Sequence, residues 1–365
     1  MRQIFYRLSC CGVLLPALLL LQLALPISPT TQAATHIGRD STNSIDATVY
    51  LPTGSLQPLF QQQINQQVPT AVNGAISSMV NKLPSGDRGW ATQMATALLQ
   101  PSATLVSLTP QQNGLVATIR ISLYPGDPSP TNASILVTMT TRDSATVQVG
   151  AQALPGNPTL VSGPLSTIAI PFGQLNSINA TPSCGDAALA VHIQIPLSLN
   201  GQASAQGQQA TTMARVVTNS TPAYVEIPSS SVSSMGNSIG TLSLGSNLTA
   251  RDIQVSVQNG QLVATSNITL GSSSLVLGKA TTYMQPQAVL GKLTVHVVKT
   301  TITVISLFTF PDNTYNQQIE QSLNTKLSNA LGGKFYVNSA AIGSNNSVSC
   351  AASDSLILTG TTNLG

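Results

Sequence analysis

Residues 258–265 read QNGQLVAT, and residues 112–118 read QNGLVAT. Each copy lies at a turn between two strand-like runs and continues into an Ile-x-Leu ending. Around the second copy the apolar residues alternate, with Val255 and Val257 before the turn and Leu262 and Ala264 after it. An Asn-Gly pair readily adopts the positive φ angles of a tight turn, and the alternation has the two-residue period of a strand. The sequence therefore predicts two β-hairpins. Their similarity indicates either duplication of one folding unit or a coincidence between two common turns.

Most of the remaining chain also has the composition of β-strands. Several segments are rich in Val, Ile, Leu and Thr and are bounded by Pro or Gly, which favour turns. These segments are 134–149, 160–170, 187–199, 275–284, 293–305 and 355–359. Within 293–297 three apolar residues alternate with Thr294 and His296, which predicts a strand with one buried face. The chain is therefore expected to be mostly β-sheet.

Two segments instead show the spacing of an α-helix, with apolar residues at intervals of three and four. The apolar stripe of the first comprises Leu56, Leu59, Phe60, Ile64, Val68, Val72, Ile76, Met79, Val80 and Leu83. The stripe of the second, 313–331, comprises Tyr315, Ile319, Leu323, Leu327 and Leu331. Pro69 is expected to bend or divide the first helix, because its ring removes an amide donor and crowds the preceding turn. Strands combined with these helices predict an α+β fold.

The first 33 residues are organised like a secretory signal peptide. A short basic segment precedes an apolar run over 12–25, and Thr31-Gln32-Ala33 places small residues where signal peptidase cleaves. The run of about 14 residues is shorter than the roughly 20 needed to span a bilayer. Cleavage after Ala33 or Ala34 is therefore expected, with an uncleaved anchor as the alternative. The protein is expected to be secreted or to lie at the extracytoplasmic face of the cell envelope.

Charged residues make up only 7% of the chain. Without the signal peptide, which contains Arg2 and Arg7 and no acidic residue, 12 basic and 11 acidic residues remain, a formal net charge of +1. Such a surface lacks the clustered Lys and Arg with which proteins displace counterions from nucleic-acid phosphates. Nucleic acid is therefore excluded as a partner.

Two cysteines, Cys184 and Cys350, remain after the signal peptide. In an oxidising compartment such a pair is expected to form a disulfide, which would close a loop of about 165 residues. The alternative is a pair of buried free thiols that do not meet.

The length of the mature chain exceeds what one hydrophobic core usually serves, which predicts two domains. Residues 201–222 are rich in Gln, Ala, Ser and Asn and contain few apolar side chains, so they are interpreted as a linker. The first module is then 34–200 and the second is 223–365.

The side chains that catalyse reactions or bind metals are few. The histidines His36, His192 and His296 are far apart, and none has the close spacing of a zinc site. Glu226 and Glu320 are the only glutamates. Residues 236–240, GNSIG, match the G-x-S-x-G nucleophile motif but do not follow an apolar strand. The sequence therefore predicts no enzyme, no catalytic residues, no metal and no cofactor.

The order of elements in the second half carries a resemblance to a known family. A short helix near 229–239, strands around Asn259-Gly260, two long strands, the 313–331 helix and a closing hairpin follow one another. This order resembles the tubular lipid-binding superfamily, and within it the bacterial LmeA-like phospholipid-binding proteins. The first half, with its longer helix before an Asn-Gly hairpin, is similar in outline. The resemblance implies two tandem modules, each a curled, mainly antiparallel sheet packed around a long amphipathic helix, with an apolar groove for acyl chains.

Each apolar stripe either closes an ordinary core or lines such a groove, and some residues could do both. The residues expected to bind a lipid or another apolar ligand are Leu56, Phe60, Ile64, Val68, Val72, Ile76, Ile319, Leu323 and Leu327. The expected partners are this ligand and, at the periphery, a membrane. The alternative is a structural or adhesive cell-surface protein without a ligand.

Overall fold

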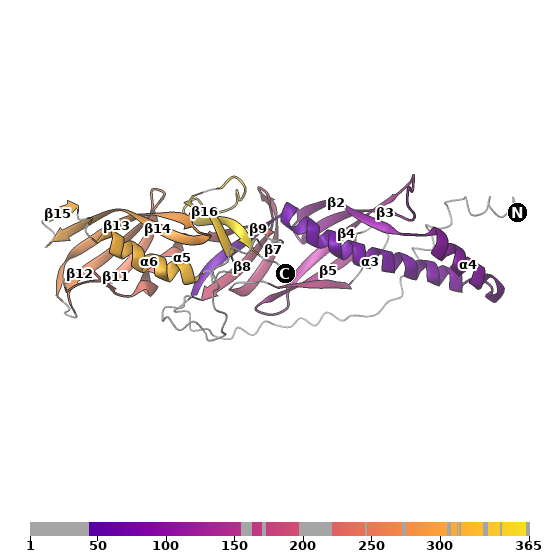
Figure 1. The fold of residues 1–365 in the computed structure, drawn as a ribbon, viewed down its shortest axis with the longest axis horizontal. Coiled ribbons are helices and arrows are strands. Elements are labelled where there is room, and N and C mark those ends of the chain that lie inside the picture. The colour runs from indigo at the N-terminus through magenta and orange to yellow at the C-terminus, as the bar shows by residue number, and fades with distance from the viewer. Residues whose placement is uncertain are drawn as a thin grey trace. The chain divides into compact units, whose positions relative to one another are not determined.

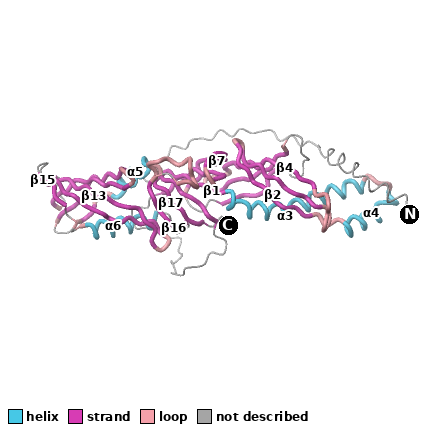
Figure 2. The backbone as a smooth tube through the Cα atoms, turned by 90° about the horizontal axis from the view of Figure 1, so that it is seen from above, coloured by secondary structure: helices cyan, strands magenta, loops and turns pink. Residues whose placement is uncertain are grey.

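The protein is an α+β fold dominated by curled antiparallel sheets, with few helices (Figures 1 and 2). This computed structural model describes residues 44–154, 163–169, 173–196, 221–244, 247–271, 275–304, 308–311, 313, 315–330, 335–343 and 345–362. The described residues divide into two compact units. The first covers 56–139 and 148–167, and the second covers 44–55, 140–147 and the residues from 168 onward.

The first unit contains a five-stranded sheet in the order β2-β3-β4-β5-β6. Its strands are β2 (Ser102–Gln111), β3 (Gly114–Ser122), β4 (Thr131–Thr141), β5 (Thr146–Ala153) and β6 (Gly163–Ala169), and its helices are α3 (Thr53–Asn81) and α4 (Ser85–Leu98). Alternate residues of the central strands are buried, among them Leu115, Ala117 and Ile119 of β3. The two-residue period that predicted these strands therefore produces the buried face of the sheet.

Helix α3 lies beside β2 (Figures 1 and 2). The Gln61 side chain joins them, since its Nε2 donates to the Ala103 carbonyl at 3.1 Å and its Oε1 accepts from the Leu105 amide at 2.7 Å. Because β2 is an edge strand, the Gln61 amide takes hydrogen bonds that a neighbouring strand would otherwise make.

The second unit contains two six-stranded sheets. One has the order β16-β17-β9-β1-β8-β7 and the other runs from β10 to β15 in chain order. The strands of the first are β1 (Ser44–Pro52), β7 (Gln174–Cys184), β8 (Ala187–Pro196), β9 (Thr221–Ile227), β16 (Phe335–Ile342) and β17 (Leu356–Thr362). Those of the second are β10 (Leu242–Ser243), β11 (Leu248–Gln258), β12 (Gln261–Leu270), β13 (Val276–Val289), β14 (Lys292–Val304) and β15 (Phe308–Pro311). Helices α5 (Ser229–Ile239) and α6 (Asn316–Ala330) pack against the β10–β15 sheet at β11 and β14.

The compact units do not divide the chain at the expected linker, 201–222. Strand β1 pairs with β8 on one side and with β9 on the other, so the β16–β7 sheet combines strands from both expected modules. Pairing between strands that are far apart in sequence leaves no mark on composition. Residues 201–220 of the expected linker and residues 1–33 of the expected signal peptide lie outside the described residues.

Both Asn-Gly hairpins are present, but only one uses the pair as expected. Asn259 and Gly260 form the turn between β11 and β12, with φ angles of 49° and 74°. In the first hairpin the turn residues are Gln112 and Asn113, while Gly114 begins β3. A Cβ at Gly114 would lie 2.2 Å from the Val137 carbonyl oxygen of β4. This glycine therefore permits the close approach of two strands.

The helices differ from expectation in two respects. Helix α3 continues through Pro69 as a single helix of 29 residues, so Pro69 does not divide it. Helix α4 was not predicted at all. The second predicted helix, 313–331, is confirmed as α6.

Candidate functional site

A cavity lies between the β10–β15 sheet and helix α6 in the second unit. It is lined by Leu242, Leu244, Ala250, Ile253, Ala264, Ser266, Ile268, Ala280, Thr282, Thr300, Ile302, Tyr315, Ile319 and Leu323. About 480 Å³ of space not filled by atoms lies among these side chains, part of it open to solvent. The cavity proper has a volume of only about 30 Å³. The cavity is thus apolar, narrow and partly open.

Small side chains on the sheet leave this space. Ala250, Ala264, Ser266 and Ala280 all line the cavity at positions where a Leu or Ile would fill it. Ala264 and Ser266 alternate with the exposed Thr265 along β12, yet both are only half-buried. Solvent therefore reaches the inner face of the sheet through the opening of the cavity.

The two threonines of the lining are engaged with the protein. The Thr300 hydroxyl donates to Oδ1 of Asn316 in α6 at 2.7 Å. Thr282 Oγ1 lies 3.3 Å from Thr300 Oγ1, so Thr282 is the donor in this second bond. Because both hydroxyl protons are used in this way, neither Thr282 nor Thr300 offers a free donor to a ligand.

Helix α6 is attached to β14 through the backbone of that strand. Asn324 Oδ1 accepts from the Val295 amide at 2.7 Å, and its Nδ2 donates to the Val295 carbonyl at 3.1 Å. Glu320 Oε2 accepts from the Val297 amide at 3.0 Å and lies 3.1 Å from His296 Nδ1. Strand β15 pairs only with residues 301–304 of β14. The side chains of Asn324 and Glu320 therefore take the place of a neighbouring strand at Val295 and Val297.

The residues expected to bind a ligand fall into two groups. Ile319 and Leu323 line the cavity and are buried, whereas the side chain of Leu327 lies outside the described residues. On α3, the buried residues are Leu56, Phe60, Ile64 and Val68, with at most 7% of any side chain exposed, while Val72 and Ile76 are half-buried. These six α3 residues belong to the first unit, whereas the first three residues of the helix, 53–55, belong to the second.

Sequence reasoning missed the sheet side of the cavity. Most of its residues lie on β10 to β14 at alternating positions, so the strand period could have identified them once the buried face was known. The strand period does not show, however, that small residues of β11, β12 and β13 lie together opposite α6.

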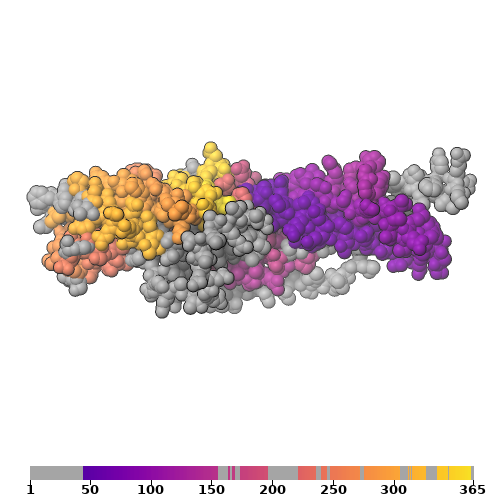
Figure 3. All heavy atoms as spheres, viewed as in Figure 1, coloured from indigo at the N-terminus to yellow at the C-terminus, as the bar shows by residue number. Residues whose placement is uncertain are grey.

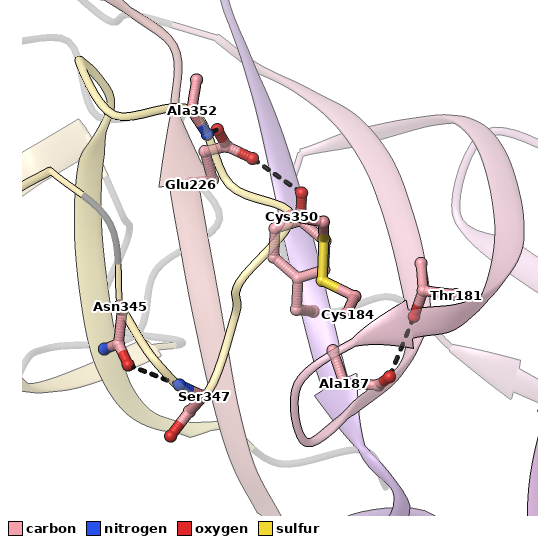
Figure 4. The surroundings of a disulfide bond; sticks show 9 residues. Thr181, Cys184, Ala187, Glu226, Asn345, Ser347, Cys350 and Ala352 are labelled. Atoms are coloured by element: carbon pink, nitrogen blue, oxygen red, sulfur yellow. Dashed lines mark hydrogen bonds between the residues drawn. A yellow bond between two sulfur atoms is a disulfide. The ribbon is translucent and has the colours of Figure 1, made fainter.

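A second cluster surrounds the disulfide between Cys184 and Cys350, whose Cα atoms are 4.9 Å apart (Figure 4). The predicted bond is confirmed. Beside it, the buried Glu226 carboxyl accepts hydrogen bonds from Tyr50 Oη at 2.7 Å, the Ala352 amide at 2.8 Å and Ser355 Oγ at 2.7 Å. Burial, then the hydrogen bond to Glu226 and its negative charge, raise the pKa of Tyr50 well above its ordinary value.

This cluster holds the segment 345–355 against the sheet. Both oxygens of Glu226 are occupied by protein donors, so the carboxyl is not placed to take a proton from a substrate.

Among the described residues, no three His, Cys, Asp or Glu side chains come together as a metal site. His192 contacts Thr48 at 3.0 Å. The absence of an enzyme activity, metal or cofactor stays a prediction.

No family model and no curated protein matches the chain. Among solved structures, it is similar to P47 from Clostridium botulinum A2, with 7% sequence identity and a TM-score of 0.29. That alignment covers 87% of this chain and 97% of P47. The resemblance to the tubular lipid-binding superfamily therefore stays a prediction. In the described part of the chain, no helix combines the length and apolar character needed to cross a bilayer.

Proposed function

We propose that this protein is an exported, non-enzymatic carrier that holds a lipid or another apolar ligand. The observation that carries the proposal is the apolar cavity between the β10–β15 sheet and α6, in which Ile319 and Leu323 face small sheet residues. Transfer of hydrocarbon from water to such a lining is favourable by about 0.8 kcal/mol for each buried methylene. The disulfide between Cys184 and Cys350 supports the exported location, because such bonds persist in oxidising compartments.

The width of the cavity favours a slender ligand. The cavity volume of about 30 Å³ is far below that of an ordinary ligand pocket, so it is too small for a ring system and suits at most part of one acyl chain. A longer stretch of chain requires α6 to move away from the sheet. Helix α6 is attached to β14 by hydrogen bonds to Glu320, Asn324 and Asn316. Because water can replace these bonds, the helix can separate from the strand without leaving buried polar groups unpaired.

The first unit is proposed to be another ligand-binding module, similar in design to the second unit. It too combines a hairpin at an Asn-Gly sequence, a curled sheet and a helix whose side-chain amide bonds to the backbone of a strand. In this proposal the amphipathic stripe from Leu56 to Ile76 is the counterpart of Ile319 and Leu323 and contributes to ligand binding. Transport and storage of the ligand are both compatible with this arrangement.

The first test is mass spectrometry of the mature protein from its own host, under native conditions and then after solvent extraction. Co-purified lipid near one equivalent or above is the expected result. A protein without ligand that also takes none from added phospholipid vesicles would contradict the proposal and favour a structural or adhesive role.

A matched pair of variants tests the cavity itself. Ala264→Leu places a larger side chain into the cavity, while Thr265→Leu makes a similar addition on the opposite face of β12. We expect Ala264→Leu to retain less ligand and Thr265→Leu to retain as much as the natural protein. Equal retention in both variants would show that the ligand lies elsewhere.

A further inference from the structure

Helix α4 of the first unit buries none of its 14 residues. All residues from Asn81 to Trp90 are exposed. Among the larger apolar side chains, Trp90 is 47% exposed, Met94 41% and Leu98 61%. This part of the chain, purple in Figure 3, lies on the molecular surface.

The exposed apolar residues of α4 form one stripe. Trp90, Met94 and Leu98 are four residues apart and therefore share one side of the helix. Thr92 and Thr96 are exposed on the other side, where each hydroxyl donates to the backbone carbonyl four residues earlier, at 2.8 and 2.9 Å. The helix is thus amphipathic, and the three side chains on its apolar side are all exposed.

Such a helix has little stability of its own. Isolated helices of this length are marginal in water, and Gly and β-branched residues weaken them further. Helix α4 contains Gly86 and Gly89, and the residue at its N-cap, Pro84, makes no side-chain capping bond. A Cβ added at either glycine would meet nothing within 4 Å, so this end of the helix is open to solvent. Burial of the apolar stripe against a partner would supply the missing stabilisation.

The charges beside the stripe indicate the kind of partner. Between residues 53 and 119 the only charged residues are Lys82, Asp87 and Arg88, all at or just before the start of α4. Asp87 Oδ1 accepts a hydrogen bond from Trp90 Nε1 at 3.3 Å, which holds the polar edge of the indole towards the charged end. A Trp ring with one polar edge, an apolar stripe and nearby basic residues are typical of helices that lie in the interface of a bilayer.

The size of the stripe argues against a stable protein partner. Three half-exposed side chains supply only a fraction of the roughly 800 Å² that each partner buries in a typical protein interface. Shallow insertion between lipid headgroups needs no such area.

We propose that α4 is a membrane-docking helix, which inserts Trp90, Met94 and Leu98 into the interface of a bilayer and directs Lys82 and Arg88 towards anionic headgroups. This inference extends the proposed lipid-carrier function by naming the surface at which the carrier meets a membrane. It does not depend on the cavity below α6.

Trp90 is the only tryptophan in the chain, so tryptophan fluorescence reports on α4 alone. We expect the emission of the full mature protein to shift to shorter wavelength with vesicles of phosphatidylcholine and phosphatidylglycerol. Brominated acyl chains in the same vesicles should quench it. Unchanged emission together with no co-flotation would overturn the proposal.

Two variants of α4 separate insertion from general adhesion. Leu98→Asp places a charge on the stripe and should lower vesicle partitioning about tenfold or more. Thr96→Asp adds the same charge on the other side of the helix and should bind nearly as well as the natural protein. Equal loss in both variants, or no loss in Leu98→Asp, would contradict insertion of the stripe.

Two further measurements separate membrane docking from self-association and from ligand binding in the cavity. A blue shift that grows with protein concentration in the absence of vesicles, and is lost in Leu98→Asp, would identify a second copy of the chain as the partner and overturn the membrane assignment. The Ala264→Leu variant should float with vesicles as the natural protein does even though it retains less ligand. Loss of vesicle binding in Ala264→Leu would contradict the independence of α4 from the cavity.

Discussion

Replacement of Glu226 tests how the segment 345–355 is held to the β16–β7 sheet of the second unit. The Glu226 side chain is only 8% exposed and accepts three hydrogen bonds, from Tyr50, Ala352 and Ser355. Hydrogen bonds to a charged group contribute about 1.5–3 kcal/mol each, and removal of the carboxyl also removes its own desolvation cost. We therefore expect Glu226→Ala to lower the free energy of unfolding by about 3–5 kcal/mol.

The conservative variant Glu226→Gln should be much milder. Its amide oxygen can still accept from Ala352 and Ser355, and its amide nitrogen can donate to the Tyr50 hydroxyl, which also accepts hydrogen bonds. We expect a loss of about 1 kcal/mol, measured by urea unfolding of the oxidised protein followed by far-UV circular dichroism. If Glu226→Ala unfolds at the same urea concentration as the natural protein, or if Glu226→Gln is as unstable as Glu226→Ala, the reasoning is wrong.

Three further predictions concern the second unit. Burial and Glu226 raise the pKa of Tyr50 above its unfolded value of 10.0. The stability that this residue contributes is therefore present below about pH 10 and is lost as the pH rises further. The urea midpoint of Tyr50→Phe should depend less on pH between about pH 8 and pH 11 than that of the natural protein. Replacing both Cys184 and Cys350 by Ala opens a loop with a sequence separation of 166 and should lower the free energy of unfolding by about 5 kcal/mol, with unchanged stability arguing against the bond. Asn324→Ala removes two hydrogen bonds between α6 and β14 and should lower the free energy of unfolding by about 1–2 kcal/mol. Replacing the exposed Gln321 by Ala should change it hardly at all. Equal unfolding midpoints in the two variants would show that the bonds contribute nothing.

The features that the sequence predicts correctly are those encoded by neighbouring residues. The turn at Asn259-Gly260 follows from local backbone preference. Helix α6 follows from the spacing of Ile319 and Leu323. The disulfide was predicted from cysteine number and compartment rather than from geometry, and the structure confirms it.

Features that depend on distant contacts or on conflicting local signals were missed. The segment 134–149 forms two strands, because the side chain of Asp143 accepts from the Ala145 amide at 2.8 Å and stabilises a turn inside an apolar run. Helix α4 escaped prediction because Gly86, Gly89 and its threonines have low helix propensity. The pairing of β1 with both β8 and β9 has no signal in either strand alone.

The candidate site was predicted only on its helical side. The stripe with Ile319 and Leu323 could be recognised from its period, but the space opposite it exists because Ala264, Ser266 and Ala280 converge from different strands. Packing of small residues across a sheet depends on strand register, which sequence spacing does not fix. The same limit applies to α3, where spacing alone did not distinguish the buried Val68 from the half-buried Ile76.

The attachment of α6 to β14 also bears on self-association. A strand edge with free amides and carbonyls can recruit a strand from another molecule, which leads to polymers or aggregates. The amide and the carbonyl of Val295 are already bonded to Asn324, and the amide of Val297 is bonded to Glu320. If α6 swings away to admit a ligand, it uncovers this edge for as long as it is open. The side chains of Asn324 and Glu320, which attach α6 to β14, therefore also keep neighbouring molecules from adding to the sheet.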